Sequence, residues 1–135
     1  MANDGHLRRL RKGVRHWNFW RARYSGAPDL SGADLHGEDL FNVNFLNANL
    51  VGANLSGSSL SDAILIDADL RQANFNKANF LEADLSGANL SGVDFTGAFF
   101  EGSDLSGANL SEANLSDSTF CCLASSLPGV CMGIS

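Results

Sequence analysis

Residues 83–92 read ADLSGANLSG, two copies of a five-residue unit that recurs along most of the chain. From Leu30 to Phe120 every fifth residue is Leu or Phe, at nineteen consecutive positions. The residue two places earlier is small, Ala at twelve positions and Ser or Val at five, and Asp or Asn stands between the two at fifteen positions. So regular a period indicates a repeat protein rather than an ordinary globular core.

A period of five fits neither regular element of secondary structure. On an α-helix, five residues advance by about 140°, so the large apolar side chains would spread around every side. On a continuous strand, successive Leu or Phe residues would point to opposite faces. We therefore expect the chain to run extended for about three residues, with the small and the large apolar residue on one face, and then to turn a corner. Asp, Asn and Gly at the other positions are typical turn residues.

The pattern A-[D/N]-L-x-x, as in residues 53–57 and 88–92, closely resembles that of the pentapeptide repeat family. The resemblance covers about residues 26–120. It implies an all-β solenoid, a right-handed quadrilateral β-helix of about five turns, with the nineteen repeats set four to a turn. Stacked turns would then place Phe75 on Phe95, and Phe80 on Phe100 and Phe120, in aromatic ladders along the axis.

The net charge of −6 divides unevenly along the chain. Residues 1–27 hold seven of the nine Lys and Arg residues against one acid, Asp4, whereas the remaining chain holds Arg71 and Lys77 against fourteen acids. A short basic segment therefore precedes an acidic body. No stretch has the apolar run of a secretory signal or of a transmembrane helix, so we expect a cytoplasmic protein.

An α-helical cap is predicted at the N-terminus, within residues 1–25. Apolar residues at three- and four-residue spacings indicate one amphipathic, basic helix over residues 6–24. Trp17 and Trp20 are expected to cover the first turn, because the open end of a solenoid exposes apolar axis and unpaired strand edges. The basic side leaves two alternatives open, association with an anionic membrane surface and contact with nucleic acid.

Glu38 occupies a position that is small and directed inward in the other repeats. A carboxylate buried without a partner is too costly to retain. We therefore predict that a cation of the capping helix reaches Glu38, with Arg21 or Arg23 favoured because they are nearest in sequence.

The repeat pattern stops at Phe120, and residues 121–135 are predicted to be a C-terminal cap or tail folded over the last turn. Self-association through a terminal turn, to give a homodimer, is the alternative that the family resemblance implies. Cys121, Cys122 and Cys131 are expected to be free thiols, since two are adjacent and the tail has no His to complete a metal site.

Residues with catalytic or cofactor-binding chemistry do not gather in one motif. His36 is the one His within the repeats, at an outward position, and the uniform Ser residues mark no single nucleophile. An active site needs a group of polar residues that departs from the regular pattern of its fold, and here the five-residue pattern is almost uninterrupted. We expect a protein that is not an enzyme and that has no cofactor and no metal.

The outward positions of the repeats carry six large apolar residues that form a candidate interaction patch. Phe41, Leu81 and Phe99 are predicted on one side of the coil, and Leu46, Ile64 and Ile66 on the next. The patch favours a non-catalytic structural or protein-interaction module whose protein partner is unknown. Scattered surface hydrophobic residues, which are normal on soluble proteins, are the alternative interpretation.

The family resemblance implies a further alternative, since some pentapeptide repeat proteins mimic DNA and bind gyrase-type topoisomerases. A rod of about 23 Å corresponds to duplex DNA with about 13 or 14 phosphates. Only six of the fourteen acids project clearly outward, and Arg71 and Lys77 oppose them. DNA mimicry is therefore expected to be weak, and direct binding of nucleic acid by the acidic body is not expected. The six outward acids are Asp62, Asp67, Glu82, Glu101, Glu112 and Asp117.

Overall fold

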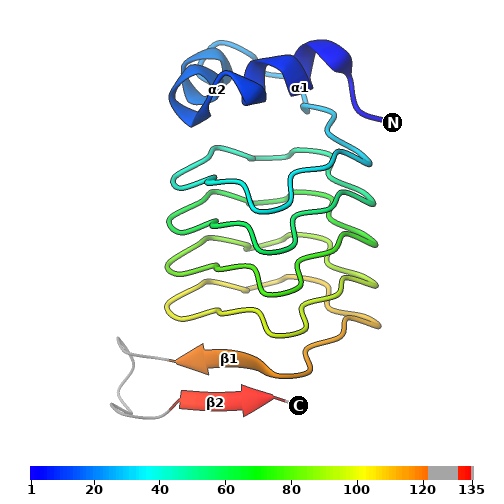
Figure 1. Ribbon diagram of the computed structural model, residues 1–135, viewed down its shortest axis with the longest axis vertical. Coiled ribbons are helices and arrows are strands. Elements are labelled where there is room, and N and C mark those ends of the chain that lie inside the picture. The colour runs from blue at the N-terminus through cyan, green and yellow to red at the C-terminus, as the bar shows by residue number, and fades with distance from the viewer. Residues whose placement is uncertain (122–130, 135) are drawn as a thin grey trace.

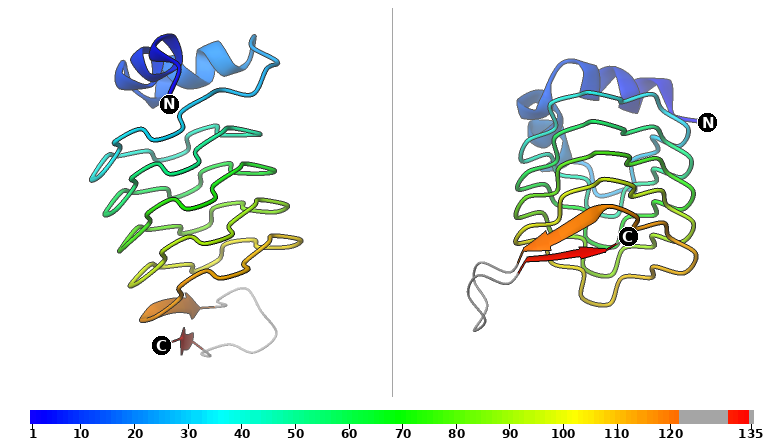
Figure 2. Two further views of the ribbon diagram at one scale, coloured as in Figure 1. Left: turned by 90° about the vertical axis from the view of Figure 1, so that its right-hand side faces the viewer. Right: turned by 60° about the horizontal axis from the view of Figure 1, so that its bottom comes forward.

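The computed structural model describes residues 1–121 and 131–134. The elements in chain order are α1 (Asp4–Arg11), α2 (Val14–Arg21), β1 (Ser118–Cys121) and β2 (Cys131–Ile134). Between α2 and β1 the chain winds into a stack of flat turns (Figure 1). The two helices lie across one end of the stack, and β1 and β2 lie at the other end (Figure 2).

The coil repeats every twenty residues. Parallel bridges join residues twenty apart, from Asp29–Asn49 through Phe99–Thr119. Five-residue repeats at this period make four faces, which we number from the repeats centred on Leu30, Leu35, Leu40 and Phe45 and on every twentieth residue after each. Residues at the same position of one face therefore form a column along the coil.

The axis of the coil is filled by the Leu and Phe side chains, which are buried from Leu30 through Phe100. The predicted aromatic ladders are present, with Phe75 and Phe95 stacked at 5.6 Å and Phe80 and Phe100 at 5.0 Å between ring centroids. Phe120 continues the second ladder at 4.6 Å from Phe100. These contacts bury the apolar side chains in register from one turn to the next.

The corners explain the polar residues of the repeat. The Asp or Asn side chain accepts a hydrogen bond from the backbone N–H two residues later. The Ser86 N–H, for example, donates to Asp84 Oδ1 at 3.0 Å. The last residue of the unit is left-handed, with φ of 66° at Gly57 and 57° at Asp67. Gly, Asn and Asp tolerate this conformation best, which accounts for their frequency there.

The capping segment forms two helices, so the prediction of one helix over residues 6–24 is wrong. α1 ends at Arg11 and α2 begins at Val14, because Gly13 between them adopts a φ of 110° that an α-helix does not allow. The break lets both helices turn an apolar side toward the coil, and Leu10 and Trp17 are buried there. In the described part of the chain, neither helix is long and apolar enough to cross a membrane.

The C-terminal strands β1 and β2 are antiparallel, in a register that runs from Ser118 opposite Ile134 to Cys121 opposite Cys131. β1 continues the third face, because Thr119 bridges to Phe99 in the preceding turn. The predicted thiol state of Cys121, Cys122 and Cys131 and the predicted packing of the tail concern side chains outside the described residues.

Candidate interaction surface

The apolar patch predicted from the sequence falls on two adjacent faces of the coil. Phe41, Leu81 and Phe99 belong to the third face, and Leu46, Ile64 and Ile66 belong to the fourth. Phe41 and Phe99 are the most open, at 53% and 52% of their full exposure, and the two Ile residues are half-buried. Among the described residues, the coil's exposed large apolar side chains all lie on these two faces.

The columns show which patch residues are neighbours. Leu46 and Ile66 share a column on consecutive turns, which are joined by a 2.9 Å hydrogen bond from the Asn47 N–H to the Ile66 carbonyl. Ile64 and Ile66 flank the buried Leu65 on one turn, so both project from the fourth face. Leu46, Ile64 and Ile66 therefore form one contiguous cluster.

The third-face residues are spread more widely. Leu81 and Phe99 lie on consecutive turns, because Phe99 bridges to Asn79 in the turn of Leu81. Phe41 lies two turns from Leu81 in the same column, with Ser61 between them. The six residues are thus distributed around one corner of the coil, and polar residues separate Phe41 from the rest.

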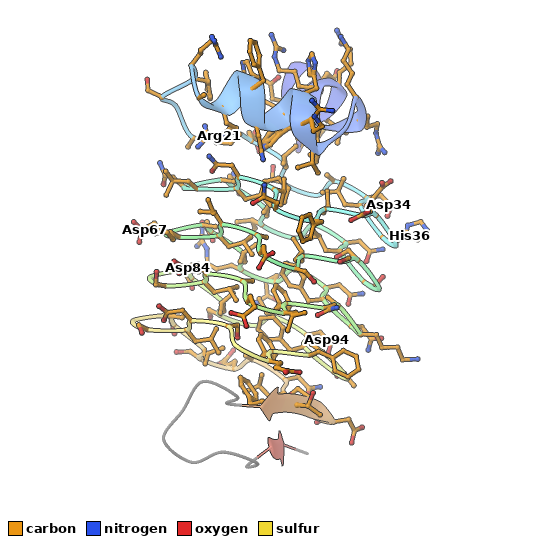
Figure 3. The ribbon with its side chains drawn as sticks, turned by 90° about the vertical axis from the view of Figure 1, so that its left-hand side faces the viewer. Arg21, Asp34, His36, Asp67, Asp84 and Asp94 are labelled. Atoms are coloured by element: carbon orange, nitrogen blue, oxygen red, sulfur yellow. The ribbon has the colours of Figure 1, made fainter. Side chains whose placement is uncertain are left out.

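Charge divides between the faces in the same way as the apolar residues. The third and fourth faces carry eight acids and no Lys or Arg, whereas the first and second carry six acids together with Arg71 and Lys77. Asp67 and Asp84 lie at one edge of the coil, and Asp34 and His36 lie at the opposite edge (Figure 3). The eight acids around the patch are Glu38, Asp39, Asp62, Asp67, Glu82, Asp84, Glu101 and Asp104.

Two of the six acids on the first two faces, Asp69 and Asp34, have a basic side chain beside them. Arg71 pairs with Asp69 at 2.7 Å, and this hydrogen bond lowers the pKa of Asp69. His36 Nδ1 lies 2.7 Å from Asp34, whose hydrogen bond raises the pKa of His36. Among the described residues, the one ion pair that involves an acid of the other two faces is that of Glu38. Apart from Glu38, the acids around the patch therefore have no ion-pair partner among the described residues.

A cation of the capping segment approaches Glu38 as predicted, but the position of the Glu38 side chain and the identity of the cation differ from the prediction. Its side chain is exposed rather than inward, and its nearest cation is Arg11 at 4.0 Å. α1 rather than α2 passes beside this corner, and Leu10, Leu35 and Glu38 line a depression of about 250 Å³ there. The open depression lets the carboxylate turn toward solvent, so a buried clasp is not needed.

Arg21 and Arg23, the predicted partners of Glu38, have other roles. Arg21 is 8% exposed and donates to three backbone carbonyls, those of Tyr24, Gly26 and Leu46, at 3.1, 3.0 and 2.7 Å. Burial lowers the pKa of Arg21. The Arg23 guanidinium lies 3.9 Å from the ring centroid of Phe19. Arg21 therefore attaches the cap to the first turn through carbonyl oxygens rather than through a carboxylate (Figure 3).

The predicted capping residues lie between the helices and the first turn. Trp17 is fully buried, and its Nε1 donates to the Asn44 carbonyl at 2.7 Å. Trp20 packs between Trp17 and Tyr24, with ring centroids at 5.0 and 4.5 Å. Because the apolar side of the helices is used against the coil, this side is not offered to a lipid bilayer.

The cap also has a basic depression that was not predicted from the sequence. The regular spacing of its basic residues could have indicated it. Arg8, Lys12 and His16 recur every fourth residue, and with Gly5 and Arg9 they line an open depression of about 400 Å³. In the described part of the chain, no group of three or more His, Cys, Asp or Glu residues is placed to hold a metal ion.

A four-sided coil with a five-residue repeat and an apolar axis defines this protein as a repeat solenoid. The family model described as pentapeptide repeats (8 copies) matches residues 26–62, 53–92, 63–102 and 83–120. The chain belongs to the pentapeptide repeat family. Membership implies the right-handed quadrilateral β-helix, and no enzyme family is indicated.

Solved structures of the same family resemble the chain. A pentapeptide repeat protein from the Arabidopsis thaliana thylakoid lumen is 34% identical over 67% of this chain and 63% of its own, with a TM-score of 0.65. The pentapeptide repeat protein Rfr23 of the cyanobacterium Cyanothece 51142 is 39% identical over 64% and 56%, with a TM-score of 0.47. One from Nostoc Pcc 7120 is 31% identical over 75% of each chain, with a TM-score of 0.40.

The chain spans less than two thirds of the length of the first two of these structures. Among curated protein sequences, none matches it significantly.

Proposed function

We propose that this chain is a non-catalytic protein-interaction module whose third and fourth faces bind a partner that presents both cationic and apolar side chains. The proposal rests on one observation, that exposed apolar residues and basic residues are distributed unevenly over the faces of the coil. The coil's exposed large apolar side chains lie on the two faces that have no Lys or Arg. Charge complementarity therefore selects a cationic partner.

The coil is suited to this role because it is rigid. Every turn is joined to the next by backbone hydrogen bonds, such as those of 2.7 Å from Phe45 to Ile64 and from Leu65 to Asp84. A surface held in place before binding loses little conformational entropy when the partner docks. The contiguous cluster of Leu46, Ile64 and Ile66 would supply the apolar contact, and the surrounding acids would supply orientation.

DNA mimicry fits the distribution of charge less well. Duplex DNA carries phosphates around its whole circumference, about one per 1.7 Å of helix axis. In this chain the third and fourth faces carry eight acids and no Lys or Arg, whereas the first and second carry six acids together with Arg71 and Lys77. The apolar residues between the acids also have no counterpart in a phosphate backbone.

The test is affinity capture from the native host with three forms of the protein, followed by identification of partners by mass spectrometry. One variant carries Leu46→Asp and Ile66→Asp on the fourth face. The matched control carries Val51→Asp and Ser91→Asp, which add the same charge at the same repeat position on the first face. The proposal predicts a protein retained by wild type and control and lost from the fourth-face variant. Equal retention by all three forms would contradict it.

The preference for a cationic partner is tested separately, by removing carboxylate charge without disturbing the backbone at the corners of the coil. Asp67→Asn with Asp84→Asn removes two of the eight negative charges around the patch, and Asp94→Asn with Asp117→Asn removes two at the same repeat positions on the second face. Asn already occupies both repeat positions elsewhere in the coil. Asn47 corresponds to Asp67, and Asn44 corresponds to Asp84. The patch variant should bind the captured partner more weakly and with less dependence on salt. Unchanged binding would leave an interaction module whose partner is not selected by charge.

A further inference from the structure

We propose that the outer side of the helical cap is a binding site for a phosphate group, carried either by a small soluble molecule or by a lipid headgroup. The site is the open depression of about 400 Å³ lined by Gly5, Arg8, Arg9, Lys12 and His16. Its volume lies within the range of about 300–1,000 Å³ that is typical of small-molecule sites. This proposal is independent of the interaction patch, which lies on the sides of the coil.

Among the described residues, no carboxylate lines this depression. Residues 5–28 contain no Asp or Glu, and the nearest preceding acid, Asp4, does not line the depression. Among the described residues, no ion pair involves Arg8, Arg9 or Lys12. Phosphate is the anion that such a set of Arg and Lys side chains recognises best, because Arg offers paired N–H donors and Lys a compact charge.

One cation of the site is already held in place. The Arg9 guanidinium donates to the Gly5 carbonyl at 3.2 Å and lies 5.1 Å from the ring centroid of Trp20. Trp20 in turn packs against the buried Trp17. Arg9 is thereby connected to the core of the cap, which reduces the entropy that it would lose on binding an anion.

Helix stability does not account for the whole cluster. Arg8 and Arg9 lie in the last turn of α1, where cations are favourable. Like charges four residues apart, as at Arg8 and Lys12, nevertheless destabilise a helix. A bound anion would relieve this repulsion.

The acidic body does not prevent an anion from approaching the cap. The helices lie at the end of the stack, so that each successive turn is further from their outer side (Figure 1). Turns are spaced by about 4.8 Å, and charges are screened over about 8–10 Å at physiological salt. The acids of the later turns are therefore largely screened from a ligand on the cap.

The experiment measures binding of pyrophosphate by calorimetry and binding of vesicles by co-sedimentation. The site variant carries Arg8→Gln and Lys12→Gln, and the control carries Arg15→Gln and Arg23→Gln, which remove the same charge outside the depression. Circular dichroism melts establish that each variant is folded. Pyrophosphate affinity should fall by at least about tenfold in the site variant and by less than about threefold in the control. Equal loss in both variants, or no binding of pyrophosphate by wild type, would overturn the proposal.

The vesicle arm distinguishes the two sources of phosphate. Phosphatidylcholine vesicles that contain phosphatidic acid are compared with vesicles that contain phosphatidylserine at the same charge density. Preference for phosphatidic acid, displaced by pyrophosphate, supports a lipid headgroup at the site. Pyrophosphate binding without vesicle binding supports a soluble phosphorylated ligand. Vesicle binding that pyrophosphate does not displace, or that is equal for the two lipids, would overturn a lipid at this site and indicate diffuse attraction alone.

Discussion

The indole nitrogen of Trp17 donates a hydrogen bond of 2.7 Å to the backbone carbonyl of Asn44, at the place where a preceding turn of the coil would otherwise bond. The neighbouring Asn44 N–H donates to the side chain of Asn18 at 2.8 Å, and Arg21 donates to the Leu46 carbonyl at 2.7 Å. α2 thus bonds to the fourth face of the first turn through side chains instead of backbone. These contacts satisfy the strand edge of the fourth face at this end of the coil.

Trp17→Phe tests the capping bond. The substitution keeps an aromatic ring on the apolar axis and leaves the partly buried Asn44 carbonyl without its donor, so the free energy of unfolding should fall by about 1–3 kcal/mol. Urea unfolding measures the loss. Phe19→Leu, at a residue of α2 that is 64% exposed, serves as the control and should change little. Equal effects of the two substitutions would mean that the cap is held without this bond.

Stability should fall as the pH is lowered, because of His6. Its Nδ1 accepts the backbone N–H of Asp29 at 2.9 Å, which requires the neutral ring. Burial, together with Arg9, lowers the pKa of His6 from its ordinary value of 6.5. As the pH falls below 6.5, the unfolded chain therefore binds this proton before the folded chain does, and stability is lost.

His6→Asn isolates this effect, because the Oδ1 atom of Asn can accept a hydrogen bond from the Asp29 N–H and Asn does not titrate. The stability of wild type relative to the variant should decline between about pH 7.5 and pH 5.5 in urea unfolding. His36 has a raised pKa and contributes in the opposite direction, with stability lost as the pH rises through its folded pKa. His36 is present in both proteins, so its contribution cancels in the difference. A difference that does not vary with pH would contradict the role of His6.

The sequence predicts the body of the fold because each repeat satisfies its own local rules. The Leu and Phe positions, the Asx bonds and the ladders all follow from a five-residue pattern with few exceptions. The cap is less predictable, since apolar spacing indicates a helix but does not show that Gly13 divides it. Glu38 was misplaced for a related reason, because the direction of an exposed side chain at the end of the coil depends on which helix passes over it.

The corner glycines should be needed for their backbone conformation rather than for space. Gly57 has a φ of 66°, and a Cβ built there would meet no atom within 4 Å. Gly57→Ala should therefore cost about 1 kcal/mol of stability through the left-handed conformation alone. Gly57→Asn should cost less, because Asn42 and Asn47 adopt this conformation at the same repeat position. Thermal unfolding measures both, and an equal cost for Ala and Asn would contradict the explanation.

The aromatic ladder should contribute strongly to stability. Phe100 is 2% exposed and stacks between Phe80 and Phe120, so Phe100→Ala should cost about 3–5 kcal/mol. Ser91→Ala, at a position directed away from the axis, should stay within about 0.5 kcal/mol. Guanidinium unfolding compares the two. Similar midpoints would mean that Phe100 does not lie in a packed column.

The candidate surfaces were less predictable from the sequence than the fold. The six patch residues could be identified as outward from the repeat alone, and Leu46 and Ile66 could be aligned at twenty residues. The segregation of Arg71 and Lys77 from the patch becomes visible only when every residue is assigned to a face. The basic depression depends on how two short helices pack, which the repeat does not specify.

Every surface described above depends on the alignment of residues twenty apart into columns. The most direct test is a pair of insertions after Ala68, one of a single Ser and one of a duplicate of residues 49–68. The duplicate adds a whole turn and keeps the register, so it should retain a cooperative thermal transition within a few degrees of wild type, or higher. The single residue should rotate the later Leu and Phe side chains off the axis and remove that transition. Circular dichroism melts that show equal damage from both insertions would contradict the stacked coil.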